Sequence, residues 1–119
     1  MREIKIRIIK YKFWDKKNKE FLRVLCLADA FKEYERNPDR YIPLQCSDLP
    51  DKNGVEICEG DIIEMYQKNN NELALTREVL FSNGSFNIDN SYLLYELEKL
   101  YLVNIIVIGN IYENKDLIK

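Results

Sequence analysis

Three carboxylate side chains stand close together near the middle of the chain, and carboxylates at short spacing can hold a cation or share acid–base chemistry. They are Glu59, Asp61 and Glu64, and they lie within residues 44–66, the stretch around which the rest of the chain is organised. A hard-cation site needs several convergent oxygens at a characteristic loop spacing, and no such spacing occurs here. We therefore predict that these carboxylates belong to turns and to the solvent-facing side of two joined strands.

The other candidate groups are three cysteines, Cys26, Cys46 and Cys58, in a chain that has no histidine. Their odd number and wide spacing predict three unpaired thiols packed as small buried hydrophobic residues, not a disulfide framework. The lack of histidine disfavours a zinc site and excludes Ser–His and Cys–His nucleophiles. We predict no metal, no cofactor and no catalytic residue. A Ser–Lys or carboxylate enzyme remains an alternative to which no residue points.

Charge is unevenly distributed along the chain. Residues 2–23 contain nine Lys or Arg against three Asp or Glu, whereas residues 24–119 contain nine against seventeen. A basic segment of this kind can form a nucleic-acid surface, with Trp14 or Tyr11 stacking on a base. The side chains that would meet phosphates are Lys10, Lys12, Lys16, Lys17, Lys19 and Arg23. The alternative is a solvated strand face whose lysines prevent edge-to-edge pairing, with Trp14 as a core anchor.

Length and composition bound the class of protein. A chain of 119 residues with 46% hydrophobic and 12% aromatic residues is expected to fold as one domain, residues 1–119. Two sub-lobes are possible within it, residues 1–46 and residues 47–119. No apolar run approaches the ~20 residues that span a bilayer, and no signal-peptide pattern opens the chain. We expect a cytoplasmic protein without a membrane segment.

Periodicity predicts short strands joined by turns, with helices at residues 28–37 and 92–100. Two tight turns are predicted at the Asn-Gly pairs Asn53-Gly54 and Asn83-Gly84, because both residue types tolerate positive φ. Gly60 and Asp61 are expected to form a further turn. A break at Gly109-Asn110 is expected to end the last long strand. The predicted strands cover residues 2–14, 21–27, 41–46, 55–58, 62–66, 73–81, 85–88, 101–108 and 111–112, and the 101–108 strand is expected to be buried on both faces.

Three segments resemble the motifs of the YopX family of phage and prophage proteins. SDLPDKNGVEICEGDIIE resembles its central motif, WDKKNKEF its N-terminal motif and GNIYENKDLI its closing motif, in the family's order. The chain departs from the pattern at Asp48, where the family has glycine, and at Lys115, where it has proline. Residues 1–9 extend ahead of the usual start. The motif residues expected to be structural are Trp14, Asp51, Asn53, Gly54, Gly60, Asp61, Gly109 and Asn110.

The resemblance implies an all-β fold and a phage or prophage origin, and it carries no activity, because the family has no assigned chemistry. We predict a mainly β, YopX-like fold: a small SH3-like barrel and sandwich mixture of antiparallel strands with one or two short helices. The predicted function is that of a non-enzymatic phage or prophage accessory protein that acts by protein–protein interaction. Its partner would be a second copy of the chain or a host protein in the bacterial cytoplasm. A nucleic-acid-binding module using the basic N-terminal hairpin is the alternative.

Overall fold

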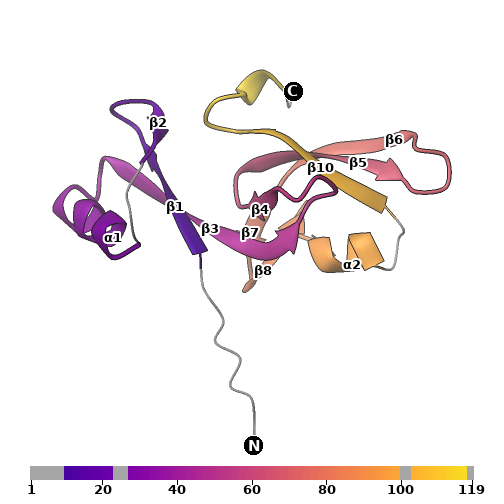
Figure 1. The fold of residues 1–119 in the computed structure, drawn as a ribbon, viewed down its shortest axis with the longest axis horizontal. Coiled ribbons are helices and arrows are strands. Elements are labelled where there is room, and N and C mark those ends of the chain that lie inside the picture. Colours follow the sequence, from indigo (N-terminus) through magenta and orange to yellow (C-terminus); the bar gives the residue numbers. More distant parts are fainter. Residues whose placement is uncertain (1–9, 23–26, 100–102, 118–119) are drawn as a thin grey trace, which may run out of the picture.

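The computed structural model describes residues 10–22, 27–99 and 103–117 (Figure 1). Its N-terminal elements are β1 (Lys10–Asp15), β2 (Glu20–Phe21), α1 (Leu27–Arg36) and β3 (Tyr41–Pro50). The later elements are β4 (Glu56–Cys58), β5 (Asp61–Gln67), β6 (Leu73–Glu78), β7 (Leu80–Ser82), β8 (Ser85–Ile88), β9 (Tyr92–Leu93), α2 (Leu94–Lys99), β10 (Val103–Asn110) and the 3₁₀ turn η1 (Lys115–Leu117). The predicted strand over residues 2–9 and most of the one over residues 21–27 lie outside the described residues.

An N-terminal lobe forms around the antiparallel pair of β1 and β3, in a sheet of order β2-β1-β3-β4. Helix α1 covers one face of this sheet, because its apolar side chains share one side at helical spacing. The rings of Phe31 and Tyr34 lie 5.3 and 5.6 Å from that of Phe13 between ring centroids. Phe13, Ala30 and Tyr41 are buried together there. The helix predicted at residues 28–37 is confirmed.

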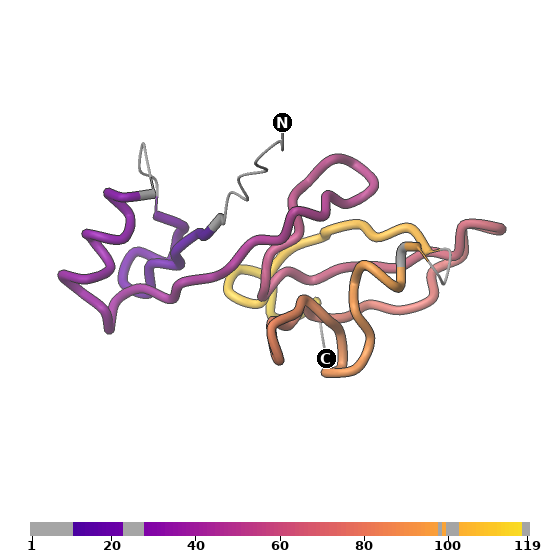
Figure 2. The backbone as a smooth tube through the Cα atoms, turned by 90° about the horizontal axis from the view of Figure 1, so that it is seen from below, coloured from indigo at the N-terminus to yellow at the C-terminus, as the bar shows by residue number. Residues whose placement is uncertain are grey.

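The second part of the molecule contains two three-stranded antiparallel sheets, of order β10-β5-β6 and β7-β8-β9. They curl around a single core (Figures 1 and 2). The buried core residues are Ile57, Ile63, Met65, Val79, Ile88, Leu94, Leu97 and Ile105. Strand β3 runs from the N-terminal lobe into this part, so one strand belongs to both. The predicted mainly β fold of antiparallel strands with one or two short helices is confirmed, and the predicted barrel and sandwich mixture takes the form of a curled half-barrel.

The strand predicted at residues 73–81 is interrupted at Val79, which corrects the sequence analysis. The Val79 amide donates to the carbonyl of Asp61, and its own carbonyl accepts from the amide of Gly60, both at 2.8 Å. These bonds to a distant turn separate β6 from β7 and direct β7 into the other sheet. Within the described residues, no helix is long and apolar enough to cross a membrane.

The last strand also differs from its prediction. Strand β10 continues through Gly109 and Asn110, which pair with Ile62 and Asp61 after a register shift, so the expected break there is wrong. Residues 111–112 lie in a turn and do not resume the strand. Of the described β10 residues only Ile105 is fully buried, and the others are half-buried. The strand is therefore not fully buried on both faces, contrary to the prediction. Strand β3 is longer than predicted and reaches Pro50.

The prediction of three unpaired thiols is wrong, because Cys46 and Cys58 form a disulfide. They are twelve positions apart in sequence, but β3 and β4 fold back antiparallel and place Cys46 directly opposite Cys58. Spacing along the chain does not reveal this register. Cys26 lies outside the described residues.

Candidate functional site

The central motif begins with a turn whose carboxylate binds backbone amides from two parts of the chain. The buried Asp51 accepts the amides of Asn53 and Val55 at one oxygen, both at 2.8 Å. Its other oxygen accepts the amide of Val107 in β10 at 2.9 Å. Gly54 has positive φ, as predicted for an Asn-Gly turn. Asn53 does not, so the prediction that Asn53 adopts positive φ in this turn is wrong. The Asp51 carboxylate therefore stabilises its own turn and also attaches that turn to β10.

The second turn of the motif joins β4 to β5 and contacts the N-terminal lobe. Asp61 accepts the Cys58 amide at 2.8 Å, and Lys12 Nζ lies 3.4 Å from its other carboxylate oxygen. Burial raises the pKa of Asp61, although the Cys58 amide and the Lys12 ammonium act against that rise. Gly60 has a φ of +84°, and a Cβ added there would lie 3.1 Å from the ring of Tyr112.

The closing motif folds onto both other motifs. The Asn110 side-chain oxygen accepts the amides of Tyr112 and Glu113 at 3.0 and 2.9 Å. Tyr112 stacks on the buried indole of Trp14, with 5.4 Å between ring centroids. A Cβ on Gly109 would lie 2.5 Å from the Asn114 side-chain oxygen, so the Asn114 side chain would have to shift for any other residue. The three motifs meet at this junction, where their residues have structural roles.

The basic hairpin retains only part of the predicted nucleic-acid surface. Lys16, Lys17 and Lys19 are exposed on the turn between β1 and β2. Lys12 faces Asp61 and lies 4.4 Å from the centre of the Phe21 ring, so its ammonium is engaged within the chain. The Lys10 side chain and the whole of Arg23 lie outside the described residues.

The two aromatic residues proposed to stack on a base lie in packed positions. Trp14 is 6% exposed, so its ring is packed inside the protein and does not present a face to a base. Tyr11 is half-buried, and its ring packs edge-on against Phe31. The exposed part of the hairpin is therefore its lysine turn.

Asp15 organises this turn, although it was not among the predicted site residues. Its carboxylate accepts hydrogen bonds from the backbone amides of Lys17 and Asn18. The Arg40 guanidinium donates two further hydrogen bonds to it, from Nε at 2.9 Å and from Nη2 at 2.7 Å. The hydrogen-bonded Arg40 guanidinium holds the pKa of Asp15 well below its usual range. The one available signal was the position of Asp15 directly after Trp14 in the N-terminal motif.

The three carboxylates considered first serve separate partners. Glu59 accepts the Gln45 amide at 2.8 Å, and Asp61 binds Cys58 and Lys12. Glu64 lies near Tyr66, where burial and this carboxylate raise the pKa of the Tyr66 hydroxyl. Asp61 and Glu64 are three residues apart on β5 and therefore point to opposite faces. In the part of the chain that the structure describes, no three His, Cys, Asp or Glu side chains are grouped to hold a metal ion.

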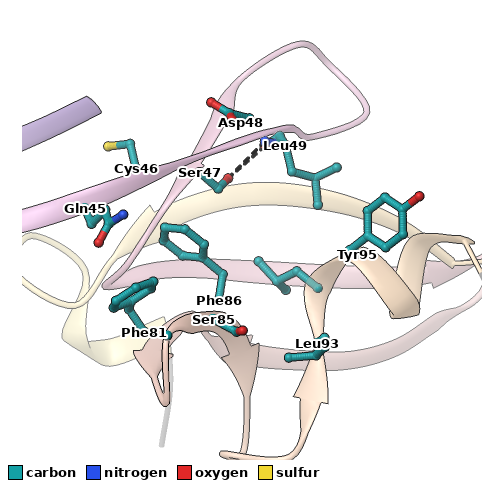
Figure 3. A pocket seen from close by; sticks show the side chains of 12 residues that line it. Gln45, Cys46, Ser47, Asp48, Leu49, Phe81, Ser85, Phe86, Leu93 and Tyr95 are labelled. Atoms are coloured by element: carbon teal, nitrogen blue, oxygen red, sulfur yellow. Dashed lines mark hydrogen bonds between the residues drawn. The ribbon is translucent and has the colours of Figure 1, made fainter. Parts of the chain in front are cut away.

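A groove of about 650 Å³ lies between β3 and the β7-β8-β9 sheet (Figure 3). Strand β3 forms one wall through residues 45–49, and Leu49 points from it into the groove. Tyr95 of α2, 65% exposed, stands at one end. The side chains that form the apolar floor are Phe81, Phe86, Leu93 and Leu94.

No pattern in the sequence as a whole indicates this groove. Its one local signal was the predicted Asn83-Gly84 turn, which makes Phe81 and Phe86 direct partners with ring centroids 4.8 Å apart. The opposite wall comes from residues some forty positions earlier, and their approach is set by the tertiary fold.

Comparisons with known proteins agree with the three motifs. A family model described as YopX protein matches residues 10–119. The crystal structure of protein EF1440 from Enterococcus faecalis has a TM-score of 0.65 and 26% identity, covering 94% of this chain and 99% of that one. Protein yopX from Bacillus subtilis has a TM-score of 0.56 at 15% identity, covering 92% and 97%, and shows the likeness of fold alone. No curated protein matches. The predicted membership is thus confirmed, and the chain belongs to the YopX family.

Proposed function

We propose that this protein is a phage or prophage accessory protein that acts without catalysis, by binding another protein through the groove. The observation that carries the proposal is the apolar groove floor beside the exposed ring of Tyr95. Contiguous exposed apolar surface marks interaction sites, and aromatic residues are enriched in them. The bacterial cytoplasm is the proposed place of action, and the resemblance to phage proteins supports it.

The chemistry of the groove defines the kind of segment that it would accept. The half-buried rings of Phe81 and Phe86 offer apolar surface for an aliphatic or aromatic side chain. Gln45, Ser47 and Asp48 on the β3 wall supply polar groups that can orient a bound main chain. The proposed partner therefore presents an apolar side chain within an otherwise polar segment.

A capture experiment with matched variants tests this proposal. Tagged wild-type protein would be incubated with host lysate and compared with Tyr95→Asp, which puts a charge into the groove at an exposed position. Tyr92→Asp is the control, because Tyr92 is 50% exposed but does not line the groove. We expect one protein to be retained by the wild type and the control and lost by Tyr95→Asp. Equal capture by all three would reject the groove. Light scattering tests self-association, for which a multiple of 14.2 kDa is expected.

A second candidate function is nucleic-acid binding by the basic turn. The observation in its favour is the exposure of Lys16, Lys17 and Lys19 on one tight turn. Phosphate contacts of this kind predict an affinity that falls steeply with salt concentration. Replacing all three lysines with glutamine should abolish binding of a labelled DNA or RNA duplex, and binding that is insensitive to salt would reject the idea. Nuclease treatment of the lysate separates this function from the first.

A further inference from the structure

A covalent link lies in the wall of the groove. The disulfide joins Cys46 of β3 to Cys58 of β4, with 3.9 Å between their Cα atoms. Cys46 lines the groove and is half-buried, whereas Cys58 is 4% exposed (Figure 3). A thiol arriving from solvent would therefore reach the Cys46 sulfur first.

The disulfide sits where the pairing between β3 and β4 is sparse. Beyond Cys46 the register shifts, and the next direct pair is Pro50 with Glu56. Between these pairs, the Ser47 hydroxyl donates to the Ile57 carbonyl at 2.6 Å. Residues 47–49, which form part of the groove wall, thus have the disulfide at one end and no direct strand pair along their length, and are otherwise held by the Ser47 hydrogen bonds and the packing of Leu49 against the core.

Noncovalent contacts next to the disulfide would survive its reduction. The Glu59 amide donates to the Gln45 carbonyl at 2.9 Å, and the Gln45 amide donates to the Glu59 side chain. Reduction would therefore remove the covalent constraint on residues 47–49 without separating β3 from β4. The predicted consequence is a local loosening of the groove wall.

We propose that Cys46 and Cys58 form a reversible redox couple that regulates the groove; this regulation rests on the proposed function and on the proposed cytoplasmic location. In a reducing compartment, the disulfides that do occur are mostly transient and redox-sensing. The reductant is a dithiol. One of its thiolates attacks the Cys46 sulfur, and the Cys58 sulfur leaves and takes up a proton. The second thiol then attacks the mixed disulfide, releasing the Cys46 thiol and leaving the reductant oxidised.

The test uses the full chain in two states, one treated with oxidised glutathione and one with dithiothreitol. Maleimide labelling after denaturation, read by intact mass, should count one thiol in the oxidised protein and three in the reduced protein. Amide hydrogen exchange at residues 47–49 should be several-fold faster after reduction. Cys58→Ser should exchange like the reduced protein in both buffers, and Cys26→Ser should keep the wild-type response. Three labelled thiols in the oxidised protein, or identical exchange in the two states, would overturn the proposal.

Neither measurement needs a binding partner, so the outcome is separable from that of the proposed function. Equal capture of one partner by the oxidised and reduced proteins would overturn the regulation while leaving the groove as the binding site. If both measurements come out as expected and Tyr95→Asp captures as well as the wild type, the redox couple stands and the proposed binding function fails.

Discussion

Individual side chains in the YopX motifs act mainly as acceptors for backbone amides. Asp51 and Asn110 each accept amides of a turn, and Asp61 accepts the amide of Cys58 where β4 enters the next turn. A buried amide without a partner costs free energy comparable to a lost hydrogen bond. These turns therefore need a short side chain with a carbonyl or carboxylate oxygen, which explains the Asp and Asn at these positions.

Replacing Asp51 should be costly, because one carboxylate accepts three amides. We expect Asp51→Ala to lower the free energy of unfolding by about 3 kcal/mol, as buried N–H groups lose their acceptor. Urea denaturation followed by circular dichroism measures this loss. Asp48→Ala is the control, since Asp48 is exposed. A similar loss in both variants would contradict the assigned role.

Glycine can be required because of a positive φ or because a neighbouring side chain leaves no space for a Cβ, and Gly54 and Gly60 allow the two reasons to be compared. Both have a φ of +84°, but an added Cβ meets Tyr112 only at Gly60 and finds open space at Gly54. Gly54→Ala should cost about 1 kcal/mol from the backbone conformation alone. Gly60→Ala should cost more, because the Tyr112 ring must also move. Equal free energies of unfolding for the two variants would show that the close approach is unimportant.

Asp15 and Asp61 should respond to pH in opposite directions. The pKa of Asp15 is lowered, so its contribution to stability is present at neutral pH and lost as the pH falls through the folded-state pKa. The pKa of Asp61 is raised, so its contribution is largest in acid and is lost as the pH rises through the folded-state pKa. The stability advantage of the wild type should therefore be larger at pH 7 than at about pH 3 over Asp15→Asn, and smaller at pH 7 than at about pH 3 over Asp61→Asn. Thermal denaturation at the two pH values measures both, and parallel profiles would refute the assignment.

At the scale of elements, sequence patterns correctly predicted the hairpins and helices whose structure depends on residues close together in the chain. The hairpin of β7 and β8 followed from Asn83-Gly84, and both residues indeed have positive φ. Helix α1 followed from apolar spacing. The interruption at Val79 did not follow, because its cause is a pair of bonds to Gly60 and Asp61. The disulfide and the groove escaped prediction for the same physical reason, since both depend on register and packing between distant segments.

The closing segment is expected to hold β1 in place through Tyr112. Trp14 is the single tryptophan, and the Tyr112 ring stacks against it. We expect Tyr112→Leu to shift Trp14 fluorescence to longer wavelength and to lower the free energy of unfolding by about 1 kcal/mol beyond the lost apolar area. Tyr95→Leu is the matched control at an exposed position. An unchanged emission spectrum in Tyr112→Leu would mean that the stack does not shield the indole.

At the scale of the whole molecule, the two sub-lobes share one strand and one junction. Strand β3 pairs with β1 in the first lobe and with β4 in the second. The Lys12–Asp61 ion pair and the Trp14–Tyr112 stack connect the lobes away from that strand. Opening this junction would expose Trp14 and leave the buried Asp61 without its cation. Both consequences favour unfolding of the chain as one unit, as proposed for a single domain of residues 1–119.

A variant in one lobe should therefore be detected by a probe in the other. Asp51 lies far along the chain from Trp14, in the turn that attaches to β10. If the chain unfolds in one cooperative transition, Asp51→Ala should shift the urea midpoint reported by Trp14 fluorescence and that reported by circular dichroism equally. Coincident curves in the wild type are the control. If the Asp51 substitution left the urea midpoint of Trp14 fluorescence unchanged, the chain would instead contain two independently folding domains, with the groove confined to the second.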